Sequence, residues 1–174
     1  MLGRNALVLA AALAAAGPVS AELTLEGVHW QAGRAPAGRA AVWREVKTLD
    51  AAARPRERLR ARLVLNNRGP QNVEGLLLRY SLTARVSPLD GSNEGAWAVP
   101  FNVEGKRVPT IGPDKMIEVP LDVAAAVDLY FRRLARAGWR PDRIKIQAMI
   151  EPHLGIKAVQ IVEDTLEIRR ETAP

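Results

Sequence analysis

Two runs of alternating apolar and polar residues between Arg56 and Val86 dominate the hydrophobic pattern of this chain. The first run places Leu59, Ala61, Leu63 and Leu65 on one face and Arg58, Arg60 and Arg62 on the other. The second places Leu76, Leu78, Tyr80, Leu82, Ala84 and Val86 opposite Leu77, Arg79, Ser81, Thr83 and Arg85. Because strand side chains alternate between two faces, we expect two long strands with an apolar inner and an arginine-rich outer face. The Asn- and Gly-rich stretch 66–72 predicts a turn that joins them as an antiparallel pair.

Shorter stretches with the same period predict further strands on both sides of this pair. They span residues 22–31, 40–47, 97–101, 107–111, 115–121, 143–151 and 159–168. Between them we expect a tight turn at 104–106 and a linker or single helical turn at 48–55. So many short strands separated by turn residues favour a mainly β fold of two packed sheets with about seven or eight strands.

The period changes to that of a helix after Asp122. Apolar residues recur at helical spacing, at Val123, Val127, Tyr130, Phe131 and Leu134. Asp122 is suited to cap the first turn, and Gly138 is suited to end the last one. We therefore expect one helix, inserted late in the fold at about 122–137.

The first 21 residues have the organisation of a secretory signal peptide. Arg4 is followed by an apolar run from Ala6 to Ala16, a Gly17-Pro18 break and the small residues Val19-Ser20-Ala21. The apolar run is shorter than the roughly 20 residues that span a bilayer, which favours cleavage after Ala21 over retention as an anchor. We expect a periplasmic or secreted protein, with residues 22–174 forming a single domain. The chain has no cysteine, so neither a lipoprotein anchor nor disulfides are expected.

One segment carries a resemblance to a known class of domains. Leu63-Val64-Leu65-Asn66-Asn67-Arg68-Gly69, followed by Val73-Glu74-Gly75-Leu76-Leu77-Leu78, resembles the strand, turn and strand of bacterial immunoglobulin-like and fibronectin-type-III-like envelope modules. The resemblance implies an immunoglobulin-like antiparallel β-sandwich. It implies no catalytic residues.

The charge is basic and consists mostly of arginine. The chain carries +6 at neutral pH, and loss of Arg4 with the leader reduces this to +5. One interpretation is ordinary solubility, with outer-face arginines that discourage edge aggregation. The other is a surface for an anionic partner, formed by Arg58, Arg60, Arg62, Arg79 and Arg85. Nucleic acid is not expected as a partner, because export separates the protein from it.

Residues that would support catalysis or bind a metal are sparse. The two histidines, His29 and His153, lie far apart in the sequence, and no nucleophile, phosphate-binding or zinc motif accompanies them. Glu163-Asp164, or Asp90 with Glu94, could contribute to a calcium site, but solvated turns explain both pairs. Trp30, Trp43, Trp97 and Trp139 are scattered, so core or rim packing is favoured over sugar stacking.

These observations predict a protein that is not an enzyme and has no cofactor and no metal. Our main hypothesis is an exported binding or assembly module of the bacterial cell envelope that acts through protein–protein contacts on its sheet faces or edges. The alternative is a binder of anionic glycan or lipid headgroups, such as lipopolysaccharide or peptidoglycan, through the arginine-rich sheet face. No membrane span is expected after cleavage, and the oligomeric state is left open.

Overall fold

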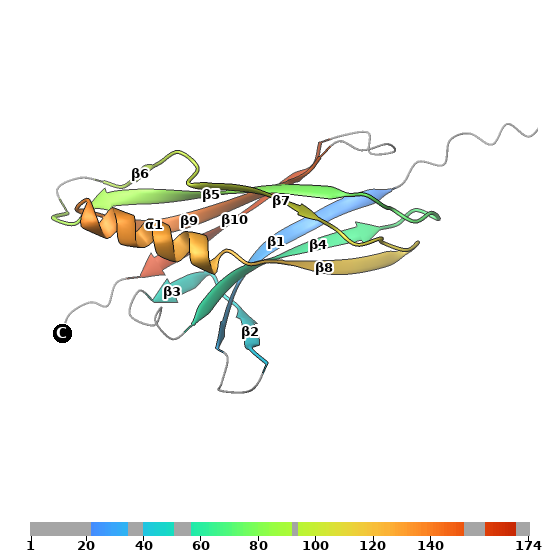
Figure 1. Cartoon of the computed structure of the whole chain (residues 1–174), viewed down its shortest axis with the longest axis horizontal. Helices are drawn as coiled ribbons and strands as arrows, with labels where there is room; N and C mark the ends of the chain where they lie inside the picture. Colours follow the sequence, from blue (N-terminus) through green and yellow to red (C-terminus); the bar gives the residue numbers. More distant parts are fainter. Residues whose placement is uncertain (1–21, 35–39, 51–56, 92–93, 152–158, 170–174) are drawn as a thin grey trace, which may run out of the picture.

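The computed structural model describes residues 22–34, 40–50, 57–91, 94–151 and 159–169. The predicted leader, residues 1–21, lies outside the described residues. The described chain forms ten strands in two sheets, with one helix between the eighth and ninth strands (Figure 1). The prediction of a mainly β fold with two sheets and one late helix is confirmed. Short strands account for the difference from the expected seven or eight.

The four-stranded sheet is antiparallel throughout. Its strand order is β2 (Val42–Glu45), β1 (Leu23–Arg34), β4 (Arg58–Asn67) and β8 (Lys115–Leu121). A β-bulge between Leu25 and Gly27 shifts the register of β1 against β4. Such a bulge restores the inward direction of the following side chains, so that Val28 and Trp30 enter the core.

The six-stranded sheet has the order β3 (Thr48–Asp50), β10 (Ile161–Arg169), β9 (Trp139–Ile150) and β5 (Leu77–Pro88), followed by β6 (Ala96–Trp97). The strand β7 (Asn102–Arg107) pairs with the other end of β5, beyond β6. The strand β3 runs parallel to β10, so the expectation of a purely antiparallel sandwich is wrong at this edge. The stretch 48–55 was expected to be a linker or helical turn, and its first residues form β3 instead.

The core lies between the two sheets and consists of the inner faces that the alternation predicts. On β4, Leu59 is 5% exposed and Ala61, Leu63 and Leu65 are fully buried. On β9, the inward residues Ile144, Ile146, Ala148 and Ile150 are at most 1% exposed. The indole of Trp30 is fully buried, and its Nε1 donates to the carbonyl of Asp164 over 3.2 Å, which connects one sheet to the other.

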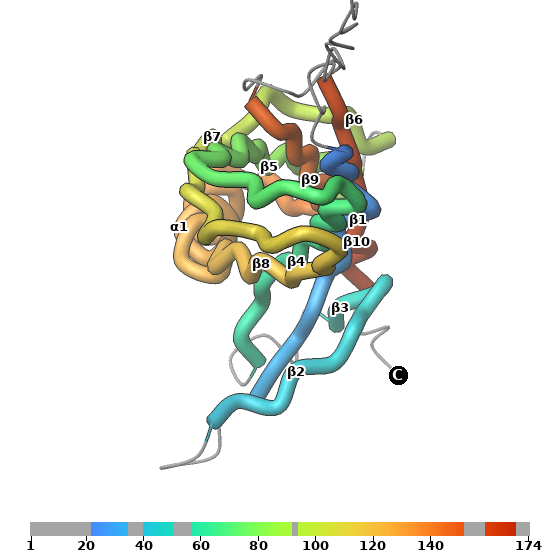
Figure 2. Tube along the Cα trace, turned by 90° about the vertical axis from the view of Figure 1, so that its right-hand side faces the viewer, coloured from blue at the N-terminus to red at the C-terminus, as the bar shows by residue number. Residues whose placement is uncertain are grey.

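The two long central strands do not pair with each other, which corrects the predicted hairpin. Both edges of β4 are already occupied, by β1 and β8, whereas β5 pairs with β9 on one side and with β6 and β7 on the other. The connection 68–76 therefore crosses from one sheet to the other (Figure 2). The buried side chain of Asn67 stabilises this crossing, because its Nδ2 donates to Gln71 O over 2.8 Å and to Gly112 O over 2.9 Å.

Three smaller expectations are also corrected. Residues 104–106 continue β7 and do not form a turn, since β7 pairs with β5 without interruption from Asn102 to Arg107. The expected return strand at 107–111 is reduced to an isolated bridge between Ile111 and Val73. Of the predicted strand at 97–101, only Trp97 lies in a strand, as the second residue of β6.

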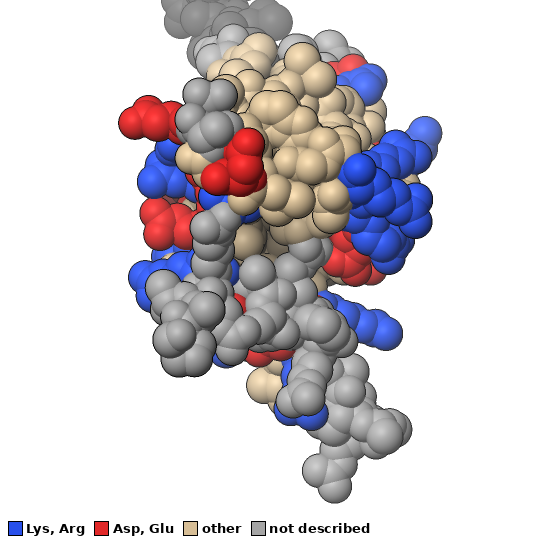
Figure 3. Space-filling model, turned by 90° about the vertical axis from the view of Figure 1, so that its left-hand side faces the viewer, with Lys and Arg blue, Asp and Glu red and all other residues tan. Residues whose placement is uncertain are grey.

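The helix α1 (Ala124–Arg136) lies along one side of the sandwich (Figure 2). Val123 and Val127 are fully buried, and the ring of Tyr130 stacks on Phe101 with 4.0 Å between the centroids. The expected cap is wrong: Val123 occupies the N-cap position, with no side-chain cap hydrogen bond. At the other end Gly138, with φ of 79°, adopts the left-handed conformation that ends a helix, as predicted. Figure 3 shows this end of the molecule, where basic side chains border a surface without charged residues.

Candidate binding surface on the six-stranded sheet

The five arginines predicted as a partner surface lie on two different faces of the sandwich. Arg58, Arg60 and Arg62 alternate with the buried leucines of β4, on the outer face of the four-stranded sheet. Arg79 and Arg85 lie on β5 and belong to the outer face of the six-stranded sheet. Because the two sheets face each other across the core, these outer faces point in opposite directions. The structure does not bring the five arginines together.

The arginines of the four-stranded sheet contact polar and aromatic groups of the same sheet. Arg60 Nε donates to Gln31 Oε1 over 2.8 Å, and its guanidinium lies 3.9 Å from the ring centroid of Trp43. Burial lowers the pKa of Arg60 from its ordinary value. Arg62 pairs with Glu118 over 2.6 Å and with Glu45 over 3.4 Å. These contacts orient the guanidinium groups along the sheet, and the carboxylates offset much of the charge that an anionic partner would meet.

The arginines of the six-stranded sheet have similar partners. Arg79 lies 3.2 Å from a carboxylate oxygen of Glu151. Arg85 lies 3.5 Å from Asp142, and its Nε donates to the carbonyl of Gly95 over 3.1 Å. On the four-stranded sheet, the remaining arginine, Arg58, is exposed at the beginning of β4. The contacts favour the interpretation that most of these arginines stabilise the sheet faces.

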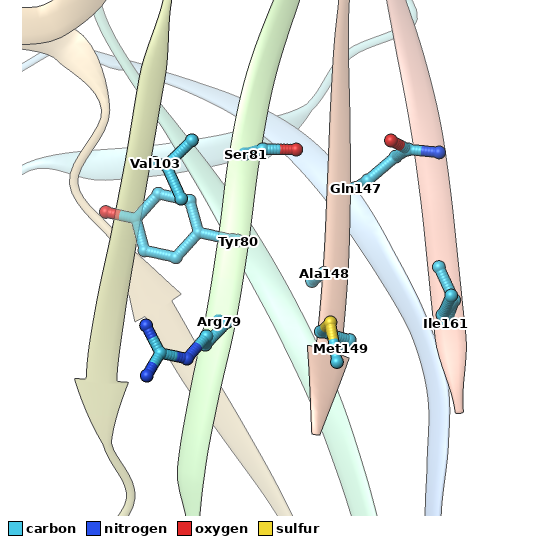
Figure 4. A pocket seen from close by; sticks show the side chains of 8 residues that line it. All are labelled: Arg79, Tyr80, Ser81, Val103, Gln147, Ala148, Met149 and Ile161. Atoms are coloured by element: carbon cyan, nitrogen blue, oxygen red, sulfur yellow. The ribbon is translucent and has the colours of Figure 1, made fainter. Parts of the chain in front are cut away.

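A different arrangement emerges on the outer face of the six-stranded sheet, where neighbouring strands align their side chains in rows. One row places Val103, Ser81, Gln147 and Glu163 side by side across β7, β5, β9 and β10. The next row places Arg79, Met149 and Ile161 beside them. The small side chain of Ser81 leaves space between the longer neighbours (Figure 4).

These rows enclose a shallow hollow of about 220 Å³. Its lining consists of Arg79, Tyr80, Ser81, Val103, Gln147, Ala148, Met149 and Ile161. Val103 and Ile161 are 65% and 62% exposed, so apolar surface faces water at two sides of the hollow. Binding pockets for whole small molecules enclose roughly 300–1,000 Å³. The hollow is below that range, and its size suits one apolar side chain of a partner.

The polar groups around the hollow are held in place by neighbouring carboxylates. Gln147 Nε2 donates to Glu163 over 2.9 Å, and the ion pair of Arg79 with Glu151 holds the guanidinium at the opposite border. The hydroxyl of Tyr80 donates to Glu104. Burial, followed by this hydrogen bond, raises the pKa of Tyr80 well above its ordinary value. Because these groups are already paired, the open part of the surface is mainly apolar.

The remaining candidate residues do not assemble a site. His29 Nδ1 lies 3.3 Å from Glu45, and His153 is outside the described residues. Within the described ranges, no group of three or more potential ligands could hold a metal ion. Glu163 and Asp164 lie in β10 and not in a turn; Glu163 bonds Gln147, and Asp164 pairs with Lys47 over 2.9 Å. Asp90 and exposed Glu94 flank residues that the structure does not describe.

The tryptophans divide into two groups. Trp30 is fully buried and Trp43 is half-buried against Gly33 and Arg60, as core or rim packing predicts. Trp97 and Trp139 are 46% and 41% exposed. Trp97 lies on the same sheet as the hollow, paired with Arg85, and the ammonium group of Lys145 lies 5.3 Å from its ring centroid.

The residues that line the hollow were not among the predicted partner-binding residues, apart from Arg79. Sequence patterning does assign Met149 to the outer face of its strand, opposite Ile144 and Ile146. An apolar residue on an outer face is the signal that could have indicated this surface. For Val103 and Ile161 the signal is absent, because the strand pairing that aligns them with Met149 is not visible in the sequence.

The described part of the chain has no helix that is long and apolar enough to cross a membrane. No protein-family model matches the chain, and no curated protein matches it. Among solved structures, the C-terminal domain of Wzt is 7% identical with a TM-score of 0.33, and the match covers 90% of this chain and 84% of that domain. A protein from Archaeoglobus fulgidus is 12% identical with a TM-score of 0.30, covering 84% of this chain and 98% of the other. Both are distant likenesses and define no family for this chain.

Proposed function

We propose that the protein is an exported, non-enzymatic binding module of the bacterial cell envelope, which takes up an apolar side chain of a partner protein in the hollow on the six-stranded sheet. The observation that carries this proposal is the apolar lining of exposed Val103 and Ile161 and half-buried Met149 on a regular sheet face. Well-placed apolar pockets of this kind hold the central residues of protein interfaces. Export is supported by the organisation of residues 1–21, and an immunoglobulin-like topology remains part of the proposal.

The arrangement of polar groups favours a protein over a glycan at this position. A sugar ring presents hydroxyl groups, each of which needs a hydrogen-bonding partner when it leaves water. At the hollow, Gln147 and Arg79 already bond to Glu163 and Glu151. These contacts use part of the hydrogen-bonding capacity that a glycan would need, whereas an apolar side chain would only displace water.

Photocrosslinking in living cells, followed by mass spectrometry, tests the proposal. A photoreactive residue at Ser81 should capture a defined envelope protein, and that protein, once purified, should bind the chain directly. The variant Val103→Lys/Ile161→Lys should abolish both capture and binding, because it places two charges at the apolar border. The matched control is Val42→Lys/Met116→Lys, since these residues are 76% and 60% exposed on the other sheet.

Equal binding by both double variants would reject the hollow as the docking site. Substrate turnover that disappears on replacement of one polar residue would reject the non-enzymatic role. The anionic-glycan alternative is tested by a lipopolysaccharide pull-down with Arg58→Ser/Arg60→Ser/Arg62→Ser. We expect no specific loss of binding there, because Arg60 and Arg62 are engaged within the sheet.

A further inference from the structure

The end of the sandwich at which β5 meets β9 carries two exposed apolar side chains next to each other. Leu89 follows the last residue of β5, and its N–H donates to the carbonyl of Gly138 over 2.9 Å. Trp139, the first residue of β9, is paired with Pro88. Leu89 is 52% exposed and Trp139 41% exposed. Together they form an apolar tip where the end of β5 lies beside the start of β9.

Basic side chains lie directly beside this tip. The helix α1 ends one turn before Trp139 and carries exposed Arg132, Arg133 and Arg136 in its last two turns. Residues three and four positions apart project from the same side of a helix, so these arginines form one group. The helix has one acidic residue, Asp128. In Figure 3 basic side chains gather along one border of a broad surface without charged side chains, and acidic side chains lie at the opposite border.

This combination differs from both sheet faces. On the sheets, arginines alternate with carboxylates that pair with them, as Arg62 does with Glu118 and Arg79 with Glu151. At the tip, the exposed arginines of α1 adjoin protruding apolar side chains. Tryptophan is enriched at the headgroup level of bilayers, and clustered arginines are attracted to anionic lipid phosphates.

We propose that this end of the protein docks on the surface of a bilayer that contains anionic phospholipids. Leu89 and Trp139 enter the headgroup region, and Arg133 and Arg136 contact lipid phosphates. The contact is peripheral, because two side chains bury far less apolar area than a membrane-inserted helix. The hollow on the six-stranded sheet lies elsewhere on the molecule, so this inference does not depend on the proposed protein partner.

Sedimentation with vesicles tests the proposal. The probes are vesicles of equimolar phosphatidylglycerol and phosphatidylcholine and vesicles of phosphatidylcholine alone. The full chain is expressed, and the first residue of the purified protein is identified by mass spectrometry. Every comparison is between variants with the same N-terminus, so any binding by the leader is common to all. We expect binding to the anionic vesicles, and Arg133→Gln/Arg136→Gln should weaken it by roughly tenfold or more, since each arginine near the surface contributes substantially.

The matched control is Arg107→Gln/Lys115→Gln, which removes the same charge from exposed residues at the opposite end of β5 and β4. It should change vesicle binding by less than about twofold, because salt screens charges beyond a Debye length. If both variants weakened vesicle binding equally, the loss would reflect the net charge of the protein and not the position of the arginines, and the proposal would be overturned. The absence of binding to anionic vesicles would overturn it as well.

A second measurement reports insertion of the tip itself. Brominated phosphatidylcholine, mixed with phosphatidylglycerol, should quench tryptophan fluorescence of the original chain, and Trp139→Phe should remove most of that quenching while leaving sedimentation largely intact. Unchanged quenching in Trp139→Phe would overturn the proposed orientation. Leu89→Ser, a substitution in an exposed turn, should weaken sedimentation, and far-UV circular dichroism establishes that each variant is folded.

Discussion

The side-chain amide of Gln160 pairs with the main chain of Leu25 in the way that a neighbouring strand would. The Leu25 N–H donates to Gln160 Oε1 over 2.6 Å, and Gln160 Nε2 donates to the carbonyl of Leu23 over 2.7 Å. The pairing of β2 with β1 extends only from Gln31 to Arg34. The amide therefore satisfies main-chain groups on a part of β1 that β2 does not reach, and it connects the two sheets beside β10.

Replacing Gln160 with alanine should destabilise the fold. The change leaves an N–H donor and a carbonyl acceptor without their partner, and each part-buried unsatisfied group lowers stability by about 1–3 kcal/mol. We expect the free energy of unfolding in urea to fall by about 2 kcal/mol, the sum of two such groups at the lower end of that range. Gln71→Ala, at an exposed glutamine in the crossing loop, is the control and should change stability by less than about 0.5 kcal/mol. Equal stability of the two variants would contradict the role of the amide.

Asn67→Ala should have a larger effect, because this side chain is fully buried and makes several bonds. Its Nδ2 donates to Gln71 and Gly112, and its Oδ1 accepts from the Gly69 N–H over 3.1 Å. Loss of these contacts should lower the free energy of unfolding by about 3 kcal/mol. The adjacent Asn66, which bonds Glu26 on the exposed face, provides the comparison. If Asn66→Ala proved as destabilising as Asn67→Ala, the crossing loop would not depend on the buried amide.

Gly33→Ala should disturb the packing of Trp43. A Cβ at position 33 would lie 2.6 Å from the Trp43 ring, which is closer than the two groups can approach. The ring must move, and we expect a loss of about 1–3 kcal/mol in the free energy of unfolding, typical of overpacking. In a Trp43→Ala background the same substitution should be nearly neutral, because the obstructing ring is gone. A double-mutant cycle in urea measures this coupling, and additive effects would show that the ring is not the cause.

Alkaline titration should reveal delayed ionisation of both tyrosines. Burial raises the pKa of Tyr80 and of Tyr130 above the ordinary value of 10.0. The folded state keeps these protons to a higher pH than the unfolded chain, so stability is unaffected below pH 10 and falls as the pH rises above it. Tyrosinate absorbance should appear later in native protein than in urea. Tyr80→Phe should flatten the loss of stability above pH 10; an unchanged profile would contradict the assignment.

Alternation along single strands proved a reliable guide to which side chains enter the core. Leu63, Leu65, Ile144 and Ile146 are all fully buried, as their period of two requires. Strand pairing, in contrast, depends on edges formed by distant segments. The Asn- and Gly-containing turn after β4 is compatible with a hairpin, yet β1 and β8 occupy both edges of β4 and leave none for β5.

The same limit applies to the binding surface. Alternation places Arg60 and Arg62 outward, but their partners Gln31, Glu45 and Glu118 come from β1, β2 and β8 and cannot be identified from the local pattern. The hollow requires Val103, Ser81 and Ile161 to come into register from three strands of the same sheet. Its existence depends on long-range pairing, which a single sequence does not display.

The crossing between β4 and β5 has a consequence for how fast the protein can fold. A hairpin between neighbouring strands needs only a short loop to close. Here, in contrast, β4 pairs with β1 and β8, and β5 pairs with β9, so each long strand requires contacts with segments distant in sequence. Closing such long loops has an entropic cost before any pairing offsets it, and domains of this kind fold in milliseconds to seconds. Until these pairings form, the main-chain groups at the edges of β4 and β5 can pair with other chains. We therefore expect misassembly to be most frequent before β8 and β9 have paired with them.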